Sequence, residues 1–413
     1  MFRKLKICRI TSAFPPPWAG LGPGPYELSA AQAELGHEVT VITKYAEGCK
    51  ALDREAPFQV RRLRAGRNLS FGFMAALEFR KLHRREKFDL IHSHGDSAVP
   101  LLLFRKLFPR VPVVSSVHIL RKAQFKALDR AEIYQTFRER RGPGMNGMLP
   151  GKAARAVDLW KERLYVKNSD FLAAVSEGIK DDITSEYGMA HKVSVVLNGV
   201  NTHYFDSARR DGKNGWLKKS GSNGMLLFVG VLNGRKGEFD LIKAMKRVTV
   251  EHPDSKLVVI GDGPTRKFAI EMAGESGLAK KIVFIPNVPR SRMSSFYAAS
   301  ELFVLPSYSE GLPKALIEAM ACGTAAVVSD IPAHKGVIRN RETGYLFRAG
   351  DTENLAAILL EALQGREERE RIAQAARAFV KEHCTWQNVA RRIDRIYDDC
   401  KRQRPGTGDV RNL

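Results

Sequence analysis

Two glutamates, Glu310 and Glu318, have the strongest chemical potential in the sequence, and both lie in the segment PSYSEGLPKALIEAMACG. The proline and the final glycine of this segment are typical of the start and end of a helix. Glu310 would then lie in the turn before the helix and Glu318 inside it. A carboxylate among apolar neighbours is costly unless it is paired or binds a ligand. The free N–H groups at the helix start, near Gly311 and Leu312, favour an anion such as a diphosphate. The competing interpretation of Glu318 is a salt bridge to an arginine.

Two cations, Arg235 and Lys236, follow the first expected strand of the second half of the chain in the segment RKGEFDLIKAM. Positive charges beside a helix start can neutralise phosphate, although such a pair alone is usually a solvated surface. His118 follows the apolar run VPVVSSV, where a lone histidine is commonly structural. Its position after a strand makes it a candidate. His92 and His94 have the same status with less support.

Glycines also follow several expected strands. Gly20, Gly22 and Gly24 precede a helical pattern and could cradle a phosphate through backbone N–H groups, or they could simply form a turn. Gly230 and Gly261 follow strands in the second half of the chain. The sequence contains no Walker pattern and no Asp-x-Asp, which disfavours a catalytic divalent cation. We therefore expect no metal and no cofactor.

The elements that must position these residues alternate along the chain. Short β-branched runs alternate with helical patterns such as 26–35, which implies parallel sheets in an α/β fold. The expected strands are 5–10, 39–43, 89–92, 111–117, 171–175 and 193–197, followed by 225–229, 256–260, 282–285, 302–305 and 325–329. Because ligands of such sheets bind beyond the carboxyl ends of the strands, the residues above should gather at those edges.

The chain of 413 residues is longer than the roughly 250–300 residues that a single core supports. We predict two facing Rossmann-like domains with a cleft between them, 1–205 and 225–385, joined by a polar linker, 206–224. A helix at 386–402 is expected to pack back toward the N-terminal domain, and a polar tail, 403–413, follows. A basic segment, 119–167, has the pattern of an inserted helix, a loop and another helix, and such a loop often handles the larger substrate.

The net charge is +22, from 67 Lys and Arg against 45 Asp and Glu. Such a charge favours nucleic acid, an anionic membrane surface or a phosphorylated ligand. No nucleic-acid-binding module is present and the charge is spread over both halves, so nucleic acid is the least favoured partner. The five cysteines are scattered, and no apolar run approaches the roughly 20 residues of a membrane span. We expect a cytoplasmic protein, in one alternative peripheral on the inner face of the membrane.

The segment LSFGFMAALEFRKLHRREK suggests that second alternative. It places four apolar residues before a basic cluster: Phe71, Met74, Leu77 and Phe79, then Arg80, Lys81, Arg84, Arg85 and Lys87. Such a segment can lie on an anionic interface or contact an anionic acceptor. An ordinary core helix with a solvated basic end is an equally good interpretation.

Taken together, the motifs resemble those of the retaining glycosyltransferases of family 4, which have the two-domain GT-B fold. The resemblance runs from residue 6 to about residue 390. It includes ELGHEVTVIT, FDLIHSH, PVVSSVH, FLAAVSEGIK, LNGRKG and, most specifically, the Glu-x7-Glu of EGLPKALIEAMACG.

The resemblance implies roles for individual residues. Glu310 would contact the donor sugar and Glu318 the ribose, while the backbone of Gly311 and Leu312 would face the sugar and diphosphate. Lys236 matches the lysine that binds the diphosphate. The resemblance also implies a role for His118 near the donor phosphate.

The sequence departs from the family at two places. Val231 stands where the family has an arginine, which Arg235 could replace, and the first loop lacks the usual Gly-Gly. The implied reaction is retaining, metal-independent transfer from a UDP- or GDP-sugar to the hydroxyl of a glycan or lipid-linked acceptor, with the N-terminal domain binding the acceptor. A nucleotide-sugar 2-epimerase of the same fold is the alternative enzyme.

Overall fold

The computed structural model describes residues 4–18, 20–66, 68–130, 152–201 and 224–402. The chain divides into two compact units. Among the described residues, unit 1 comprises 4–120, 156–199 and 386–402, and unit 2 comprises 121–130, 152–155, 200–201 and 224–385. The predicted linker, apart from Gly224, and the predicted tail lie outside the described residues.

Unit 1 is built on a parallel sheet whose described strands follow the order β3-β2-β1-β4-β5-β6-β7. This order is that of a Rossmann-like sheet with one added strand. The predicted strands of this half are confirmed, with ends shifted by one or two residues. The strands are β1 (Lys6–Ile10), β2 (Glu38–Lys44), β3 (Gln59–Leu63), β4 (Leu90–His94), β5 (Val113–Val117), β6 (Phe171–Ala174) and β7 (Val193–Val195).

Strand β3 was not among the expected strands. Its sequence, QVRRL, contains no apolar run, and its side chains are half-buried or exposed because β3 pairs with β2 alone at the sheet edge. An edge strand needs little apolar surface on either face, so its sequence pattern is weak.

The helices of unit 1 flank this sheet. The predicted inserted helices are confirmed at the two ends of 119–167, whereas the loop between them lies outside the described residues. The described helices of unit 1 are α1 (Pro23–Glu34), α2 (Cys49–Glu55), α3 (Asn68–Glu86), α4 (Val99–Leu103), α7 (Lys152–Asn168, from residue 156 onward), α8 (Glu177–Tyr187) and α18 (Trp386–Arg402), with short 3-10 turns η1 (Gly95–Ala98), η2 (Arg105–Leu107) and η4 (Ala190–Lys192). The other inserted helix, α5 (Arg121–Arg130), is grouped with unit 2.

Helix α18 packs within unit 1, although unit 2 precedes it in the chain. Its apolar side chains share a buried cluster with residues of β1, β2 and α1. Polar contacts add to this packing. The Oδ1 and Oδ2 atoms of Asp394 lie 3.0 Å from Gln32 Nε2 and His37 Nε2 respectively, and Gln32 Oε1 accepts from the fully buried Arg9. The last helix is therefore an integral part of the first core.

Unit 2 is built on a second parallel sheet, in the order β10-β9-β8-β11-β12-β13. Its predicted strands are confirmed residue for residue, and the three-residue edge strand β13 is additional. The strands are β8 (Met225–Val229), β9 (Lys256–Ile260), β10 (Ile282–Ile285), β11 (Leu302–Leu305), β12 (Ala325–Ser329) and β13 (Tyr345–Phe347).

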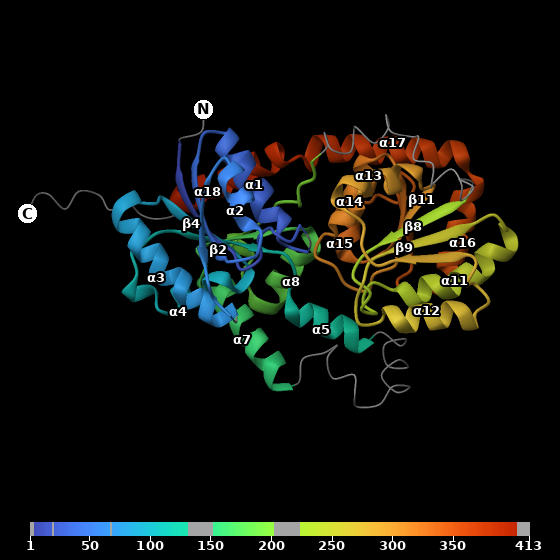
Figure 1. Ribbon diagram of the computed structural model, residues 1–413, viewed down its shortest axis with the longest axis horizontal. Helices are drawn as coiled ribbons and strands as arrows, with labels where there is room; N and C mark the ends of the chain where they lie inside the picture. The colour runs from blue at the N-terminus through green and yellow to red at the C-terminus, as the bar shows by residue number, and fades with distance from the viewer. Residues whose placement is uncertain (1–3, 19, 67, 131–151, 202–223, 403–413) are drawn as a thin grey trace, which may run out of the picture. The chain divides into compact units, whose positions relative to one another are not determined.

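Helices cover both faces of this second sheet (Figure 1). On one side lie α11 (Glu238–Glu251), α12 (Arg266–Glu275) and α16 (Thr352–Gln364); on the other lie α13 (Arg290–Ala299), α14 (Lys314–Ala321) and α17 (Arg366–His383), and the short α15 (Pro332–Lys335) follows β12. The loops that follow β8, β9, β11 and β12 share one edge of the sheet, because parallel strands end on the same side. We call this the carboxyl edge.

Candidate functional site

At the carboxyl edge of unit 2, the backbones of neighbouring loops approach each other closely at glycines. A Cβ on Gly261, whose φ is 150°, would lie 1.9 Å from the carbonyl oxygen of Gly230. A Cβ on Gly237 would lie 2.0 Å from the carbonyl oxygen of Pro306. The buried carboxylate of Glu238 joins the same loops, since it accepts from the N–H of Gly234 at 2.6 Å and from the hydroxyl of Thr265. These close approaches require glycine and hold the loop 230–237 in one position.

Glu310 is the centre of a buried charge cluster at this edge. Its Oε1 lies 2.5 Å from Lys236 Nζ and its Oε2 lies 3.4 Å from a terminal nitrogen of Arg235. The three side chains are each at most 13% exposed. Arg235 also donates to the carbonyl oxygen of Ser309. The structure thus brings Glu310 together with the cation pair Arg235 and Lys236, two features that were separate in the sequence.

This cluster holds one carboxylate against two cations. Burial raises the pKa of Glu310, but the charges of Lys236 and Arg235 outweigh burial and bring the pKa to about 2. Glu310 is therefore ionised at neutral pH, and one positive charge remains uncompensated by it. A buried excess of positive charge favours an anionic ligand, since its field is weakly screened there.

Glu318 lies on α14 and is half-buried. Its Oε2 accepts a hydrogen bond of 2.8 Å from the hydroxyl of Tyr297, a fully buried residue of α13. Burial and the charge of Glu318 raise the pKa of Tyr297 well above its ordinary value, so the phenol stays a donor. Within the part of the chain that the structure describes, Glu318 forms this phenol contact and no salt bridge to an arginine, which was the competing interpretation. Tyr297 had no signal in the sequence, because a tyrosine in a helix is usually core.

The segment before α14 is also buried. Gly311 and Leu312 are buried, Pro313 is the N-cap residue and the helix begins at Lys314, one position later than the sequence suggested. Gly323 follows the helix with φ 74°, as expected for a helix-ending glycine. At the position of the family arginine, Val231 is 55% exposed. Arg235, rather than residue 231, therefore places a guanidinium beside Glu310.

The candidate residues of unit 1 lie at the carboxyl edge of its own sheet. His118 follows β5 directly, and its Nε2 lies 3.1 Å from Nδ1 of His94 at the end of β4, with their rings stacked. His92 is instead structural. It is fully buried, its Nδ1 lies 2.5 Å from the hydroxyl of Tyr397, and its Nε2 lies 2.8 Å from Ser116 Oγ. Burial lowers the pKa of His92 well below its usual range.

The first glycine loop leads into α1 as expected. Gly22 is the N-cap residue of the helix, and Gly24 lies in its buried first turn. Gly20 has φ 59°, and a Cβ built on it meets no atom within 4 Å. This loop therefore leaves open space at Gly20, while Gly22 approaches the backbone of Phe14.

The basic segment forms α3 and corrects part of the sequence interpretation. Phe71 and Phe79, which we expected on the interfacial face, are fully buried. The reason is the helical period of 3.6 residues, which turns both of them toward the sheet. The basic residues are exposed, as expected: Arg80, Lys81, Arg84, Arg85 and Lys87.

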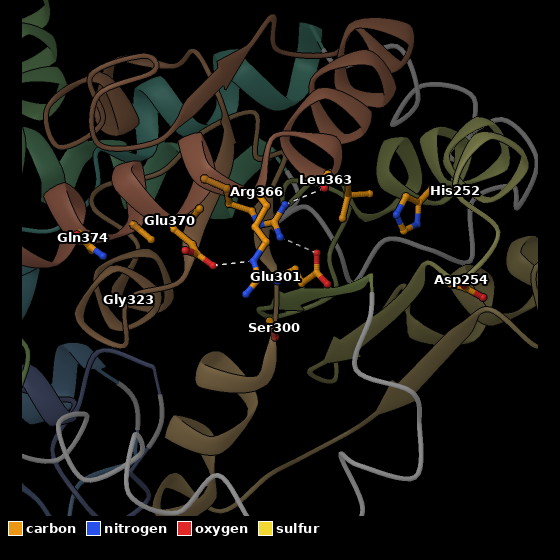
Figure 2. Close-up of a pocket in the computed structure, with 12 residues that line it drawn as sticks. His252, Asp254, Ser300, Glu301, Gly323, Leu363, Arg366, Glu370 and Gln374 are labelled. Atoms are coloured by element: carbon orange, nitrogen blue, oxygen red, sulfur yellow. Dashed lines mark hydrogen bonds and ion pairs between the residues drawn. The ribbon is translucent and has the colours of Figure 1, made fainter.

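A further cavity of about 740 Å³ lies at the opposite edge of the unit 2 sheet, where the strands start (Figure 2). Arg369 pairs with Glu301 at 3.0 Å and Arg366 with Glu370 at 2.9 Å. Each arginine in this cavity thus has a glutamate of its own. His252 lies at its far end in Figure 2, with its Nδ1 2.9 Å from Ser255 Oγ.

Two family models match the chain, one for each half. The model "Glycosyltransferase Family 4" matches residues 19–204 and the model "Glycosyl transferases group 1" matches residues 210–379. Among curated proteins, the chain is similar to a glycogen synthase of Mycobacterium tuberculosis, at 26% identity over 96% of this chain and 95% of that protein. It is also 28% identical to a D-inositol 3-phosphate glycosyltransferase of Rhodococcus opacus over 75% of this chain and 66% of the relative.

Solved structures show the same fold. A sucrose-phosphate synthase from Thermosynechococcus elongatus has a TM-score of 0.77 at 19% identity, covering 97% of this chain and all of that one. Anabaena HepE, solved in complex with UDP and glucose, has a TM-score of 0.73 at 16% identity over 96% of this chain and all of that one. Two Rossmann-like parallel sheets, the Glu-x7-Glu segment and both family models agree. The chain belongs to the family 4, group 1 glycosyltransferases with the GT-B fold.

Proposed function

We propose that this glycosyltransferase moves a sugar from a UDP- or GDP-sugar to an acceptor hydroxyl with retention of anomeric configuration and without a metal. The observation that carries the proposal is the buried cluster in which Glu310 faces both Lys236 and Arg235. Its uncompensated positive charge suits the diphosphate of a nucleotide sugar. The similarity to HepE, which binds UDP and glucose, supports the same ligand class.

In this proposal, each residue at the edge has a separate task. Lys236 and Arg235 hold the diphosphate, Glu310 accepts from hydroxyls of the donor sugar, and Glu318 accepts from the ribose. The backbone N–H groups at Gly311 and Leu312 face the diphosphate. Gly230 and Gly261 give the donor close access to the backbone. These roles follow the family motif.

Residues of unit 1 would serve the acceptor side. His118 would lie near the donor phosphate, and the loop of Gly20, Gly22 and Gly24 would contact the phosphate or the acceptor.

In the proposed reaction, the bond from the anomeric carbon to the diphosphate oxygen breaks, and the acceptor oxygen bonds to the same face of that carbon. The departing diphosphate oxygen takes the acceptor proton, so the step needs no protein nucleophile.

A thermal-shift screen across UDP-, GDP- and ADP-sugars tests this function. A true donor at 100 times its Kd stabilises the folded protein by about 2.7 kcal/mol, and the K236A variant should lose that shift. Release of UDP or GDP in the presence of acceptor mixtures, with NMR assignment of the product anomer, tests retention. No shift with any nucleotide sugar would reject the donor site, and an inverted anomer would reject retention. Conversion of the sugar without an acceptor would indicate the epimerase alternative.

We also propose an anionic membrane as a partner, which suits a lipid-linked acceptor. On α3, the residues opposite the buried face are apolar in its first half, where Phe73, Met74 and Leu77 are 43, 38 and 63% exposed. At 100° per residue, Arg80 and Arg84 lie on the same side of the helix as Phe73 and Leu77. The exposed face of α3 is thus apolar at one end and cationic at the other.

A neighbouring segment extends this surface. The ring of Phe73 lies 5.9 Å from that of Phe104, which follows α4. Leu103, Phe104 and Leu107 are 44, 41 and 66% exposed. Lys106 in η2 is exposed between them. We define the membrane-facing patch as Phe73, Met74, Leu77, Leu103, Phe104 and Leu107 with the cations of the second half of α3.

Charge decides the expected occupant of this patch. Apolar side chains beside a group of cations match the acyl boundary and anionic headgroups of a lipid surface. In a symmetric pair of chains the same patch would face itself and bring cations together. None of the described helices is both long and apolar enough to cross a bilayer, so the proposed contact is with the surface.

Vesicle co-sedimentation tests this partner. The protein should bind phosphatidylglycerol-containing vesicles and not pure phosphatidylcholine, and a F73S/L77S or R80E/R84E variant should bind at least about tenfold more weakly. Matched controls are V250S, at a 77% exposed valine, and R339E, at an exposed arginine of unit 2. Absence of binding to either vesicle, or a patch-dependent dimer in light scattering, would overturn the proposal.

A further inference from the structure

Three fully buried polar side chains lie behind Glu310 in unit 2. They are Ser307, Ser329 and His334, none of which has measurable solvent exposure. Ser307 follows β11, Ser329 ends β12, and His334 lies on the short α15. Because β11 and β12 are neighbours in the sheet, their ends bring the two serines together at the carboxyl edge.

A continuous series of hydrogen bonds joins these residues to Glu310. The Nδ1 of His334 lies 2.8 Å from the carbonyl oxygen of Ser329, the hydroxyl of Ser329 donates to the carbonyl oxygen of Ser307, and the hydroxyl of Ser307 donates to Glu310 Oε1 at 2.8 Å. The same oxygen of Glu310 contacts Lys236 at 2.5 Å. The imidazole is therefore connected to the oxygen that pairs with the lysine.

The tautomer of His334 follows from its contacts. A carbonyl oxygen can only accept, so Nδ1 carries the proton and Nε2 has a lone pair. Nε2 is buried and has no hydrogen-bond partner among the described residues. Burial lowers the pKa of His334 to about 4, although Glu310 opposes this. The imidazole is neutral at physiological pH.

A neutral ring suits this position better than a cation. A positive charge at residue 334 would compete with Lys236 for the carboxylate of Glu310 and would weaken their contact. A buried nitrogen without a partner costs free energy, so packing alone is a poor reason for histidine here. The hydrogen bond from Nδ1 to Ser329 gives histidine a specific task that an apolar residue of the same volume could not perform.

We propose that His334 is a positioning residue for Glu310, acting through Ser329 and Ser307 to hold the carboxylate oxygen beside Lys236. The inference rests on the proposed function, in which Glu310 and Lys236 bind the donor. His334 itself touches neither Glu310 nor Lys236 by any hydrogen bond in the described residues. Its effect is on the geometry of the loop that carries Glu310, where small displacements are costly to catalysis.

Three substitutions of His334 separate the effect of its hydrogen bond to Ser329 from the effect of its side-chain volume. In H334N the amide nitrogen can occupy the place of Nδ1 and donate to Ser329, whereas H334Q places its amide near Nε2 and H334A removes both. We expect H334A and H334Q to lower kcat about 10- to 100-fold, with the Kd for UDP or GDP changed less than about threefold. H334N should recover to within about threefold of wild type.

His252 supplies a matched control, because it forms a comparable Nδ1 contact with Ser255 at the opposite edge of the same sheet (Figure 2). The H252N variant should keep wild-type kcat. S307A should resemble H334A, and the S307A/H334A double variant should be no worse than either alone, since both break one series of contacts. Equal losses in H334N and H334A, or additive losses in the double variant, would overturn the proposal.

A measurement without substrate distinguishes this inference from the proposed function. Nitrogen-15 NMR of the ligand-free protein should show His334 as the Nδ1–H tautomer, and H334A should change the titration of the Glu310 carboxyl carbon. An Nε2–H tautomer would overturn the positioning role even if nucleotide sugars are turned over. If the wild-type protein turns over no nucleotide sugar but this NMR signature is present, the proposed transferase function is rejected. The positioning of Glu310 by His334 is then still supported.

Discussion

The two edges of the unit 2 sheet contain the same kinds of charged residues, but these are paired differently. At the carboxyl edge, Glu310 faces both Lys236 and Arg235. At the edge where the strands start, Arg366 and Arg369 each contact a glutamate of their own around a cavity of about 740 Å³. Each arginine at the cavity is paired with a carboxylate, whereas Glu310 compensates only one of the two cations in the buried cluster.

This difference is the reason that we propose the ligand site from charge balance and not from cavity volume. A paired arginine and glutamate already satisfy each other, so an anion entering there must break an existing contact. At the carboxyl edge, an anion gains the interaction that Glu310 leaves unsatisfied. Open space with paired charges is common on protein surfaces, whereas buried charge excess is costly and needs a function.

The largest expected effect comes from removing the lysine. K236A should lower turnover about 100- to 1000-fold, the range for a lost donor that stabilises developing anionic charge. The protein should stay folded at neutral pH, because Arg235 still compensates Glu310, although part of the stability that the ion cluster supplies is lost. Steady-state release of UDP or GDP measures the effect, with R366A as a control that keeps wild-type turnover. Comparable losses in the two variants would remove the contrast between the edges.

The pH dependence of the free energy of unfolding tests the ion cluster at the carboxyl edge, and its expected effect is the next largest. The folded pKa of Glu310 is about 2, below the ordinary value of 4.5, so its ionised form stabilises the fold above pH 4.5 and this contribution is lost as the pH falls toward 2. The shift corresponds to about 3 kcal/mol. Urea unfolding from pH 5 to pH 2 should show that loss in wild type and not in E310Q. K236A should show a smaller loss than wild type, and an unchanged pH profile in E310Q would contradict the ion cluster.

The paired arginines should behave as structural residues. R369A removes the contact with Glu301 and also the donors to the carbonyl oxygens of Ala362 and Leu363. We expect a loss of about 1–3 kcal/mol in the free energy of unfolding, measured by urea titration, with kcat of the folded enzyme unchanged. A kcat that falls without any loss of stability would instead indicate a ligand in the large cavity.

The smallest effect is expected at the exposed pair. Arg366 and Glu370 are one helical turn apart and their side chains are 80 and 58% exposed. R366A should change the free energy of unfolding by about 0.5 kcal/mol or less. Urea titrations at low and high salt measure it. A loss above 1 kcal/mol would mean that the pair contributes more than a solvated contact.

Much of this architecture could be predicted from sequence because the signals are local. Buried parallel strands such as 225–229 and 302–305 are apolar runs between turn residues, and every predicted strand of unit 2 matches the observed one. Strand β3 was not predicted because it is a half-exposed edge strand without an apolar run, and β13 was not predicted because it is only three residues long. On α3, Phe71 and Phe79 were placed on the wrong side, since an apolar residue does not show which face of an amphipathic helix meets the sheet.

At the candidate site, too, some properties could be predicted from the sequence and others depend on the tertiary structure. Sequence alone determined the fold class, the family and the set of chemically able residues, with Glu310, Glu318 and Lys236 foremost, because those properties depend on residue type and spacing. Tertiary structure decided that one carboxylate meets two cations, that Tyr297 holds Glu318, and that His334 reaches Glu310 through two serines. Arg235 and Glu310 are 75 positions apart and meet because parallel strands end at one edge of the sheet. The pairing of β11 with β12 brings Ser307 and Ser329 together, and the packing of α13 on α14 brings Tyr297 to Glu318.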